Sequence, residues 1–190
     1  MKHTVTIYCA SAANLAPLYT EAARELGRRL ALEHADIVSG AGRTGLMGAV
    51  ADAALEAGGR VTGVIPQFMV ERGWHHSGLS ELVVTPDMHR RKETMAARAT
   101  AAVALPGGIG TFEELMEIIT WRQLGLFNGN VVIYNVNNYY GPLLSMLSQA
   151  ISQGFMRPDH REIFTVAESV DEVLAAAFAE PSSREFSPKF

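Results

Sequence analysis

The stretch AAVALPGGIGTFEELMEIITW, residues 101–121, decides the fold. It begins with a short apolar run, passes through a glycine-rich turn and ends in a segment whose apolar residues recur with helical spacing. This is the order of a strand, a tight turn and a helix. Because parallel strands are joined by crossover helices, the stretch predicts one βα unit of a parallel sheet.

The same order recurs along the rest of the chain. Strands are expected at residues 4–9, 36–39, 61–65, 81–85, 101–105, 130–134 and 163–166. Helices are expected at residues 14–33, 45–57, 87–99, 111–125, 139–153 and 168–178. The alternation predicts an α/β fold, a Rossmann-like, doubly wound parallel sheet with helices on both faces. Residues 1–180 are expected to form a single domain, with an irregular stretch at 67–79 and a flexible tail at 181–190.

The composition restricts the possible functions. With 190 residues and a net charge of -4, the chain has the size of one domain and no basic excess for nucleic acid or a membrane surface. Cys9 is the single cysteine, so neither an internal disulfide nor a zinc motif is expected. The sequence has no signal-peptide core and no apolar run of membrane-spanning length. We therefore expect a cytoplasmic protein without bound metal.

Two glycine-rich loops are expected at the carboxyl edge of the sheet, where α/β proteins bind ligands. The first, SGAGRTGLMG at residues 39–48, carries Gly40, Gly42 and Gly45 with GxGxxG spacing, and the second follows the strand at 101–105. Glycine lets the backbone approach a ligand, and the N–H groups that begin the next helix favour a phosphate. Each loop alone fits a tight packing turn equally well, but the two together favour nucleotide binding.

The kind of nucleotide can be narrowed. The third strand ends in VIPQ, without the carboxylate that binds the ribose of NAD. Neither loop ends in the GK[ST] of a P-loop, which disfavours nucleoside triphosphate hydrolysis. A sugar phosphate or a nucleoside monophosphate remains as the expected ligand.

The helix expected at residues 111–125 has apolar residues on two sides. The stripe expected to face the core consists of Phe112, Leu115, Met116 and Ile119. Ile118 and Trp121 are expected on the other side with Glu114 between them, while Glu113 projects elsewhere. A second buried face needs a partner, so the pattern predicts a homodimer. The two glutamates also have a structural interpretation, as favourable charges near a helix N-terminus.

The segment PDMHRRKETM, residues 86–95, is a second candidate for function. Asp87 is expected to cap a helix, with Arg91 and Lys92 beside its apolar stripe and Arg90 projecting away from it. Charges beside a core stripe commonly extend to solvent with no further role. The alternative is that they reach an anionic substrate, because arginine suits a phosphate.

These elements together resemble a known family. PGGIGTFEE at 106–114 matches the PGGxGTxxE signature, and MHRRK at 88–92 the MHxRK element, of the LOG (Lonely Guy) family of cytokinin riboside 5'-monophosphate phosphoribohydrolases. GLMG at 45–48 and ITWRQLG at 119–125 are similar to that family too. The resemblance implies a Rossmann-like dimer that hydrolyses the N-glycosidic bond of a nucleoside 5'-monophosphate, AMP or N6-modified AMP. The products are free base and ribose 5-phosphate, and no cofactor is implied.

The resemblance also implies roles for individual residues. Arg91 and Glu114 are implied to be catalytic, and a carboxylate beside the sugar would stabilise an oxocarbenium-like state or orient water. The residues expected to bind substrate are Met88, Lys92, Gly107, Gly108, Gly110, Thr111, Glu113, Gly42 and Gly45.

The chain departs from the family at three positions. Ala10 and Ala41 stand where the family commonly has glycine, in its Cys-Gly-Ser and GGG segments. Gly73 aligns with a glutamate that many relatives carry. The added methyl groups are expected to tighten the pocket, and the base preference stays open.

Two other functions stay open as well. A pyridoxal-phosphate lysine decarboxylase, the older description of the family, needs a Schiff-base lysine. Of Lys2, Lys92 and Lys189, only Lys92 lies outside the terminal segments. A nucleotide-binding carrier or sensor without catalysis would use the glycine loops, but it gains nothing obvious from a buried carboxylate beside a phosphate site.

Overall fold

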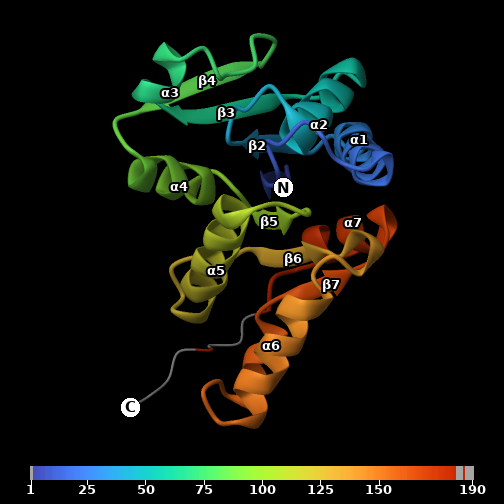
Figure 1. Ribbon diagram of the computed structural model, residues 1–190, viewed down its shortest axis with the longest axis vertical. Coiled ribbons are helices and arrows are strands. Elements are labelled where there is room, and N and C mark those ends of the chain that lie inside the picture. Colours follow the sequence, from blue (N-terminus) through green and yellow to red (C-terminus); the bar gives the residue numbers. More distant parts are fainter. Residues whose placement is uncertain (1, 183–185, 187–190) are drawn as a thin grey trace.

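The computed structural model describes residues 2–182 and 186, and within them a single parallel sheet organises the chain (Figure 1). The strands are β1 (Thr4–Tyr8), β2 (Asp36–Ser39), β3 (Val61–Pro66), β4 (Glu81–Thr85), β5 (Ala101–Ala104), β6 (Asn130–Tyr134) and β7 (Thr165–Ala167). Their order is β4-β3-β2-β1-β5-β6-β7, and every pairing is parallel. The predicted α/β, Rossmann-like class is confirmed.

The helices also follow the sequence pattern closely. They are α1 (Pro17–Leu32), α2 (Gly45–Glu56), α3 (Gln67–Glu71), α4 (Met88–Ala97), α5 (Ile109–Gln123), α6 (Gly141–Ser152) and α7 (Val170–Phe178). Two 3-10 turns, Val136–Asn138 and Pro158–Glu162, flank α6. The expectation of an irregular stretch at 67–79 is wrong at its start, because residues 67–71 form the short helix α3.

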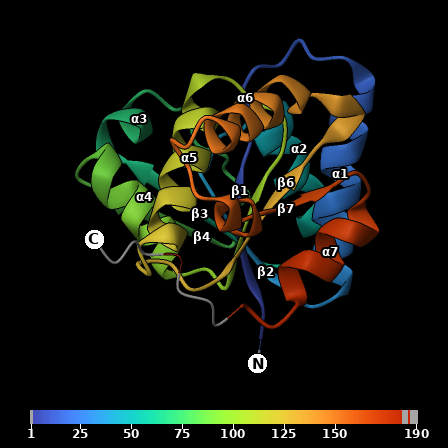
Figure 2. The ribbon, with the colours of Figure 1, turned by 90° about the horizontal axis from the view of Figure 1, so that it is seen from below.

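The sheet separates two apolar layers (Figure 2). Helices α1, α2 and α7 pack on one face and α4, α5 and α6 on the other. Neighbouring residues of a strand serve opposite layers, so Val103 packs with the first layer and Ala104 with the second. The chain winds from β1 outward to β4 and then returns to β5 on the other side of β1, which makes the carboxyl ends of β1 and β5 the topological switch point.

The predicted buried face of α5 is wrong: the helix is rotated about its axis by about 100°, one residue step, from the predicted orientation. Its buried residues are Thr111, Glu114, Leu115, Ile118, Ile119 and Arg122. Ile118, expected on a second face, is 1% exposed in the core, whereas Phe112, expected in the core, is 36% exposed. Apolar residues alone misplace the stripe because this helix buries three polar side chains, two of which face the pocket described below. Phe112 instead packs against the rings of Tyr139 and Tyr140.

The C-terminal residues are described only in part. Of the tail expected at 181–190, residues 183–185 and 187–190 lie outside the described residues. Arg122 Nη2 donates a hydrogen bond of 2.6 Å to Ser182 O, and the Arg122 guanidinium lies over the ring of Phe186, which is 2% exposed. Across the described residues, no helix is long and apolar enough to cross a membrane.

Candidate active site

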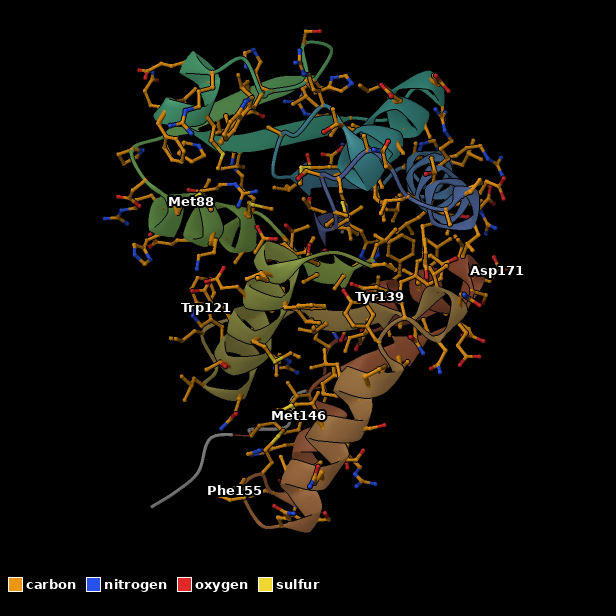
Figure 3. The ribbon with its side chains drawn as sticks, in the orientation of Figure 1. Met88, Trp121, Tyr139, Met146, Phe155 and Asp171 are labelled. Carbon is orange, nitrogen blue, oxygen red and sulfur yellow. The ribbon has the colours of Figure 1, made fainter. Side chains whose placement is uncertain are left out.

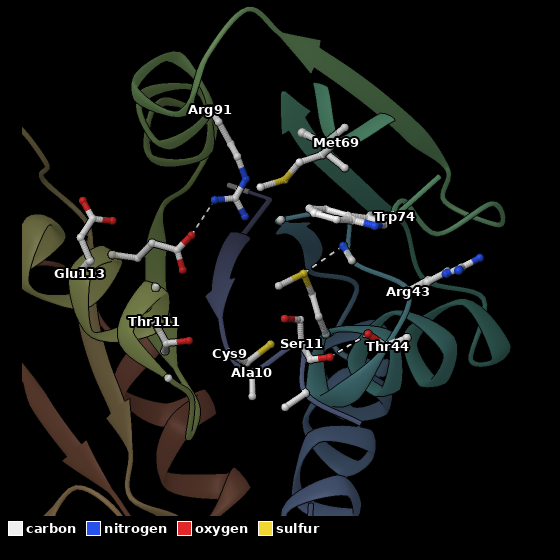
Figure 4. Close-up of a pocket in the computed structure, with 18 of the residues that line it drawn as sticks. Cys9, Ala10, Ser11, Arg43, Thr44, Met69, Trp74, Arg91, Thr111 and Glu113 are labelled. Carbon is white, nitrogen blue, oxygen red and sulfur yellow. Dashed lines mark hydrogen bonds and ion pairs between the residues drawn. The ribbon is translucent and has the colours of Figure 1, made fainter. Parts of the chain in front are cut away.

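A pocket with a volume of about 650 Å³ opens at the carboxyl ends of β1, β2, β3 and β5, at the switch point of the sheet (Figure 4). This is the size range of small-molecule sites. Its lining comes from residues distant in sequence: Cys9, Ala10, Ser11, Ala12, Gly40, Gly42, Arg43, Thr44, Met47, Ile65, Met69, Trp74, Met88, Arg91, Gly108, Gly110, Thr111, Glu113 and Glu114. Both glycine loops and both sequence motifs therefore meet at one cavity.

Arg91 is held rigidly at the wall of this pocket. Asp87 caps α4, accepting a hydrogen bond of 2.8 Å from the Arg90 N–H, which fixes the first turn of the helix. Arg91 Nε donates to Val64 O at 3.1 Å, and its Nη1 donates to Glu114 Oε1 at 2.8 Å (Figure 4, dashed line). The residue is only 6% exposed, so these bonds fix the direction of the guanidinium.

Gly40 makes this placement of Arg91 possible. A Cβ atom at Gly40 would lie 1.9 Å from Arg91 Nη2 and 3.3 Å from Met47 Sδ. The glycine of the first loop thus provides space for the guanidinium group.

Glu114 is a buried carboxylate with one strong partner. Burial raises its pKa above the ordinary value of 4.5, and the neighbouring Arg91 opposes this shift without cancelling it. Only Oε1 bonds to Arg91, so Oε2 remains available to the cavity that Glu114 lines. Such a carboxylate can stabilise positive charge or accept a proton. Cys9 lies beside it as a protonated thiol, because burial raises its pKa far above neutral pH.

The N-terminus of α5 offers unused donors to the pocket. Gly108 is the N-cap, so the N–H groups of Ile109, Gly110 and Thr111 have no acceptor inside the helix. Among the described residues they meet no other acceptor either. Gly108, Gly110 and Thr111 line the pocket, which makes this end of α5 suited to an anion.

The N-terminus of α2 is arranged differently. The N–H groups of Leu46 and Met47 donate to Ala10 O at 2.9 and 3.2 Å, so they are not free for a ligand. Gly45 has φ +65°, and a Cβ there would meet Ala12 O at 2.5 Å. Gly45 is therefore required for packing against the β1 loop and does not line the pocket, whereas Gly42 does line it. The two loops therefore differ in role: the first packs against the β1 loop, and of the two only the second presents helix N–H groups that are free for a ligand.

Lys92, Glu113 and Gly107 also differ in position from the other predicted site residues. Lys92 is 6% exposed, does not line the pocket and forms ion pairs with Glu113 and Glu117. Burial would lower the pKa of Lys92, but the hydrogen bonds to these two carboxylates outweigh it and raise the pKa. Glu113 lines the pocket rim while paired with Lys92, and Gly107 lies behind the lining against Thr111.

Part of the pocket wall has no motif in the sequence. Met69 of α3 and Trp74 line it (Figure 4). The Arg72 guanidinium stacks over the Trp74 ring at 5.0 Å. His76 fixes this segment to the first glycine loop through its N–H bond of 2.8 Å to Ala41 O, and to α2 through a 2.8 Å contact with Asp52. The only signal in the sequence was an unusually long connection between two strands.

Known proteins are similar to this chain over most of its length. The sequence profile of the family described as "Possible lysine decarboxylase" matches residues 47–177. A cytokinin riboside 5'-monophosphate phosphoribohydrolase of Rhodococcoides fascians is 42% identical over 175 residues, which cover 91% of this chain and 88% of the relative. One of Arabidopsis thaliana is 41% identical over 170 residues, 90% of this chain and 80% of the relative. The chain belongs to the LOG family.

Solved structures extend the likeness of this LOG family member to proteins of other descriptions. The molybdenum cofactor binding protein of Rippkaea orientalis has a TM-score of 0.71 at 18% identity and covers 92% of this chain, with 94% of its own chain covered. The Moco carrier protein of Chlamydomonas reinhardtii has a TM-score of 0.69 at 21% identity, with 93% and 95% covered. At these identities the likeness shows the fold alone.

One departure from the LOG pattern is visible in the backbone. Ala41 stands where the LOG loop commonly has glycine, and it adopts φ 62°, in the left-handed region. It is fully buried, and its Cβ packs so closely on Gly63 that a methyl group at Gly63 would lie 2.6 Å away. The loop thus keeps the conformation that glycine favours at the cost of some backbone strain.

Proposed function

We propose that the chain hydrolyses the N-glycosidic bond of a nucleoside 5'-monophosphate, AMP or N6-modified AMP, releasing the base and ribose 5-phosphate. The observation that carries this proposal is the buried Arg91–Glu114 pair, with a 2.8 Å contact, in the same pocket as the free N-terminus of α5. Cleavage of a nucleoside 5'-monophosphate needs one group that binds the 5'-phosphate and a carboxylate that faces the sugar ring. The named activity of relatives about 40% identical supports the same reaction.

In this proposal each group takes one step of the reaction. The 5'-phosphate binds the N–H groups at the start of α5, which places the ribose over Glu114. As the bond from C1' to the base nitrogen breaks, positive charge grows on the sugar ring, and the Glu114 carboxylate stabilises it and orients water. The water oxygen bonds to C1', and its proton goes, directly or through Glu114, to the departing base. Arg91 fixes the Glu114 carboxylate and adds positive charge near the phosphate and the base.

The test is chromatography of AMP incubated with the purified protein. Adenine and ribose 5-phosphate should form in equal amounts, and adenosine should react far more slowly because it lacks the anchored phosphate. The Glu114→Gln variant serves as the matched control, since it keeps the size of the side chain and removes its charge. Equal turnover of AMP and adenosine would contradict the phosphate anchor, and release of no base from any nucleoside monophosphate would favour a carrier.

The pyridoxal-phosphate alternative has little support from the site. A Schiff-base lysine must face the ligand and needs a lowered pKa to act as a nucleophile. Lys92 does not line the pocket, and its two carboxylate partners raise its pKa. The described residues place no other internal lysine near the cavity.

The proposal includes a homodimer, built on a different surface from the one the sequence indicated. Ile118 is buried in the core of its own chain and cannot contact a second copy. Helix α6, in contrast, has the apolar sequence GPLLSMLSQAIS but no buried residue, and it projects from the sheet (Figure 1). Met146 on it is 69% exposed, and Phe155 just beyond it is 82% exposed (Figure 3). A second copy of this face is the simplest cover for it.

A further inference from the structure

The connection between β6 and α6 is a tight turn with a costly backbone. Asn137 and Asn138 both lie in the left-handed region, with φ 51° and 56°. Asn135 holds the turn together, because its Oδ1 accepts from the Tyr140 N–H at 2.8 Å and its Nδ2 donates to Asn138 Oδ1 at 3.3 Å. The turn brings Tyr139, labelled in Figure 3, and Tyr140 into hydrogen bonds with the chain that follows β5.

The two tyrosines bind successive parts of that chain. The Tyr139 hydroxyl donates to Gly107 O at 2.5 Å, and the Tyr140 hydroxyl donates to Leu105 O at 2.7 Å. The Tyr139 ring is itself held by the rings of Tyr140, at 5.1 Å between centroids, and Tyr19, at 6.1 Å. Its hydroxyl is therefore directed at one carbonyl group of the second glycine loop.

The bond to Gly107 O determines where the next N–H points. Gly107 C=O and Gly108 N–H belong to one peptide unit, and in a trans unit they point in opposite directions. The described peptide bonds are all trans. The Tyr139 hydroxyl, which lies outside the pocket lining, holds the Gly107 oxygen, so the Gly108 N–H points to the opposite side of the peptide unit, and Gly108 itself lines the pocket.

We infer that Tyr139 is a positioning residue, which fixes the Gly108 N–H for the phosphate of the substrate; this inference rests on the proposed function. A peptide unit between two glycines rotates easily, because neither residue restricts its own backbone. A rotated unit would turn the Gly107 carbonyl oxygen toward the phosphate. The partial negative charge of that oxygen would repel the phosphate. The Tyr139 hydroxyl stabilises the binding orientation before any substrate arrives.

The test is calorimetric binding of ribose 5-phosphate, inorganic phosphate and adenine to the Tyr139→Phe variant, which loses only the hydroxyl. We expect ribose 5-phosphate and inorganic phosphate to bind about tenfold more weakly, the scale of one weakened bond to a charged group, with adenine binding unchanged. In kinetics on AMP, KM should rise more than kcat falls. Tyr19→Phe, which keeps the ring that packs on Tyr139, should bind all three probes like the wild type.

Tyr140→Phe separates positioning from stability. It removes a buried hydrogen bond to Leu105, so it should lower the thermal midpoint and leave phosphate binding within about twofold of the wild type. Equal affinity of wild type and Tyr139→Phe for ribose 5-phosphate, or an equal loss of adenine binding, would overturn the inference. Because binding is measured without turnover, a wild-type protein that binds AMP but does not cleave it would refute the proposed function and leave the role of Tyr139 intact.

A second measurement does not depend on how the variant folds. In the wild-type protein, the amide resonance of Gly108 should shift as ribose 5-phosphate is added, and that of Gly107 should shift less. A Gly108 resonance that does not move on saturation contradicts the inference.

Discussion

The substitution Gly40→Ala, in the first glycine loop, should inactivate the enzyme by displacing the side chain of Arg91 on α4. The new Cβ would lie 1.9 Å from Arg91 Nη2 and 3.1 Å from Cζ. Ordinary contact needs about 3.5 Å, so the guanidinium must move by roughly 1.5 Å. It is bonded to both Val64 O and Glu114, so its displacement toward the pocket that Arg91 lines must stretch or break these bonds.

The size of the effect follows from this displacement. A movement of roughly 1.5 Å breaks the 2.8 Å bond between Arg91 Nη1 and Glu114 Oε1. Misplacement of a catalytic group by about 1 Å costs on the order of a hundredfold in rate, so kcat/KM for AMP should fall by about that factor. The loss of one charge-assisted hydrogen bond should also lower the free energy of unfolding by roughly 1.5–3 kcal/mol.

A double-mutant cycle isolates the clash. The assay is adenine release from AMP, measured beside the thermal midpoint of each variant. In an Arg91→Ala background the guanidinium is gone, so adding Gly40→Ala should change kcat/KM by less than about threefold. Wild-type kcat/KM in Gly40→Ala alone would refute the reasoning, as would a further hundredfold loss in the Arg91→Ala background.

Three further predictions concern the charged groups and α6. Because burial raises the pKa of Glu114 above 4.5, activity that needs its ionised form should fall on the acid side of the pH profile at a pH above that value. Glu114→Gln should lose about a hundredfold in kcat and abolish this acid-side fall, while Glu113→Gln should keep it. An unchanged acid-side fall in Glu114→Gln excludes Glu114 as the titrating group. Lys92→Met should lower the thermal midpoint with little change in KM for AMP, since Lys92 pairs with Glu113 and Glu117 and does not line the pocket; a large rise in KM would restore it as a substrate contact. Met146→Glu should convert a dimer to a monomer in light scattering, and a dimer unaffected by the charge would remove α6 from the interface.

The sequence predicted the sheet well because its strands carry a strong local signal. Runs such as VTGVI and NVVIY are apolar and β-branched, and glycine, proline or polar residues bound them. All seven expected strands form within the described residues, including the weak one before α7. The orientation of α5 could not be predicted in the same way, because periodicity assumes that buried residues are apolar, whereas Thr111, Glu114 and Arg122 are buried.

The site residues that belong to a sequence motif could be predicted. Those that reach the pocket only through tertiary contacts could not. Arg91, Glu114 and the free end of α5 lie together as expected. The glycines of the two loops look equivalent in the sequence, yet only the structure shows that Ala10 O occupies the N–H groups of α2. Trp74 enters the pocket through a connection without regular pattern, which no local rule could place.

The adjacent pairs Arg91-Lys92 and Glu113-Glu114 explain one another. Neighbours on a helix point about 100° apart, so each pair directs its two side chains to different sides of its helix. The contact of Arg91 with Glu114 is buried and faces the pocket. Lys92 is also buried but does not line the pocket, and it pairs with Glu113 at the pocket rim and with Glu117. Two ion pairs at adjacent positions link α4 to α5 at two points, and they restrict rotation of one helix against the other more than a single pair would. The Lys92–Glu113 pair thus helps keep the Arg91–Glu114 pair in register, and Glu114, whose pKa is raised by burial, keeps its place in the pocket.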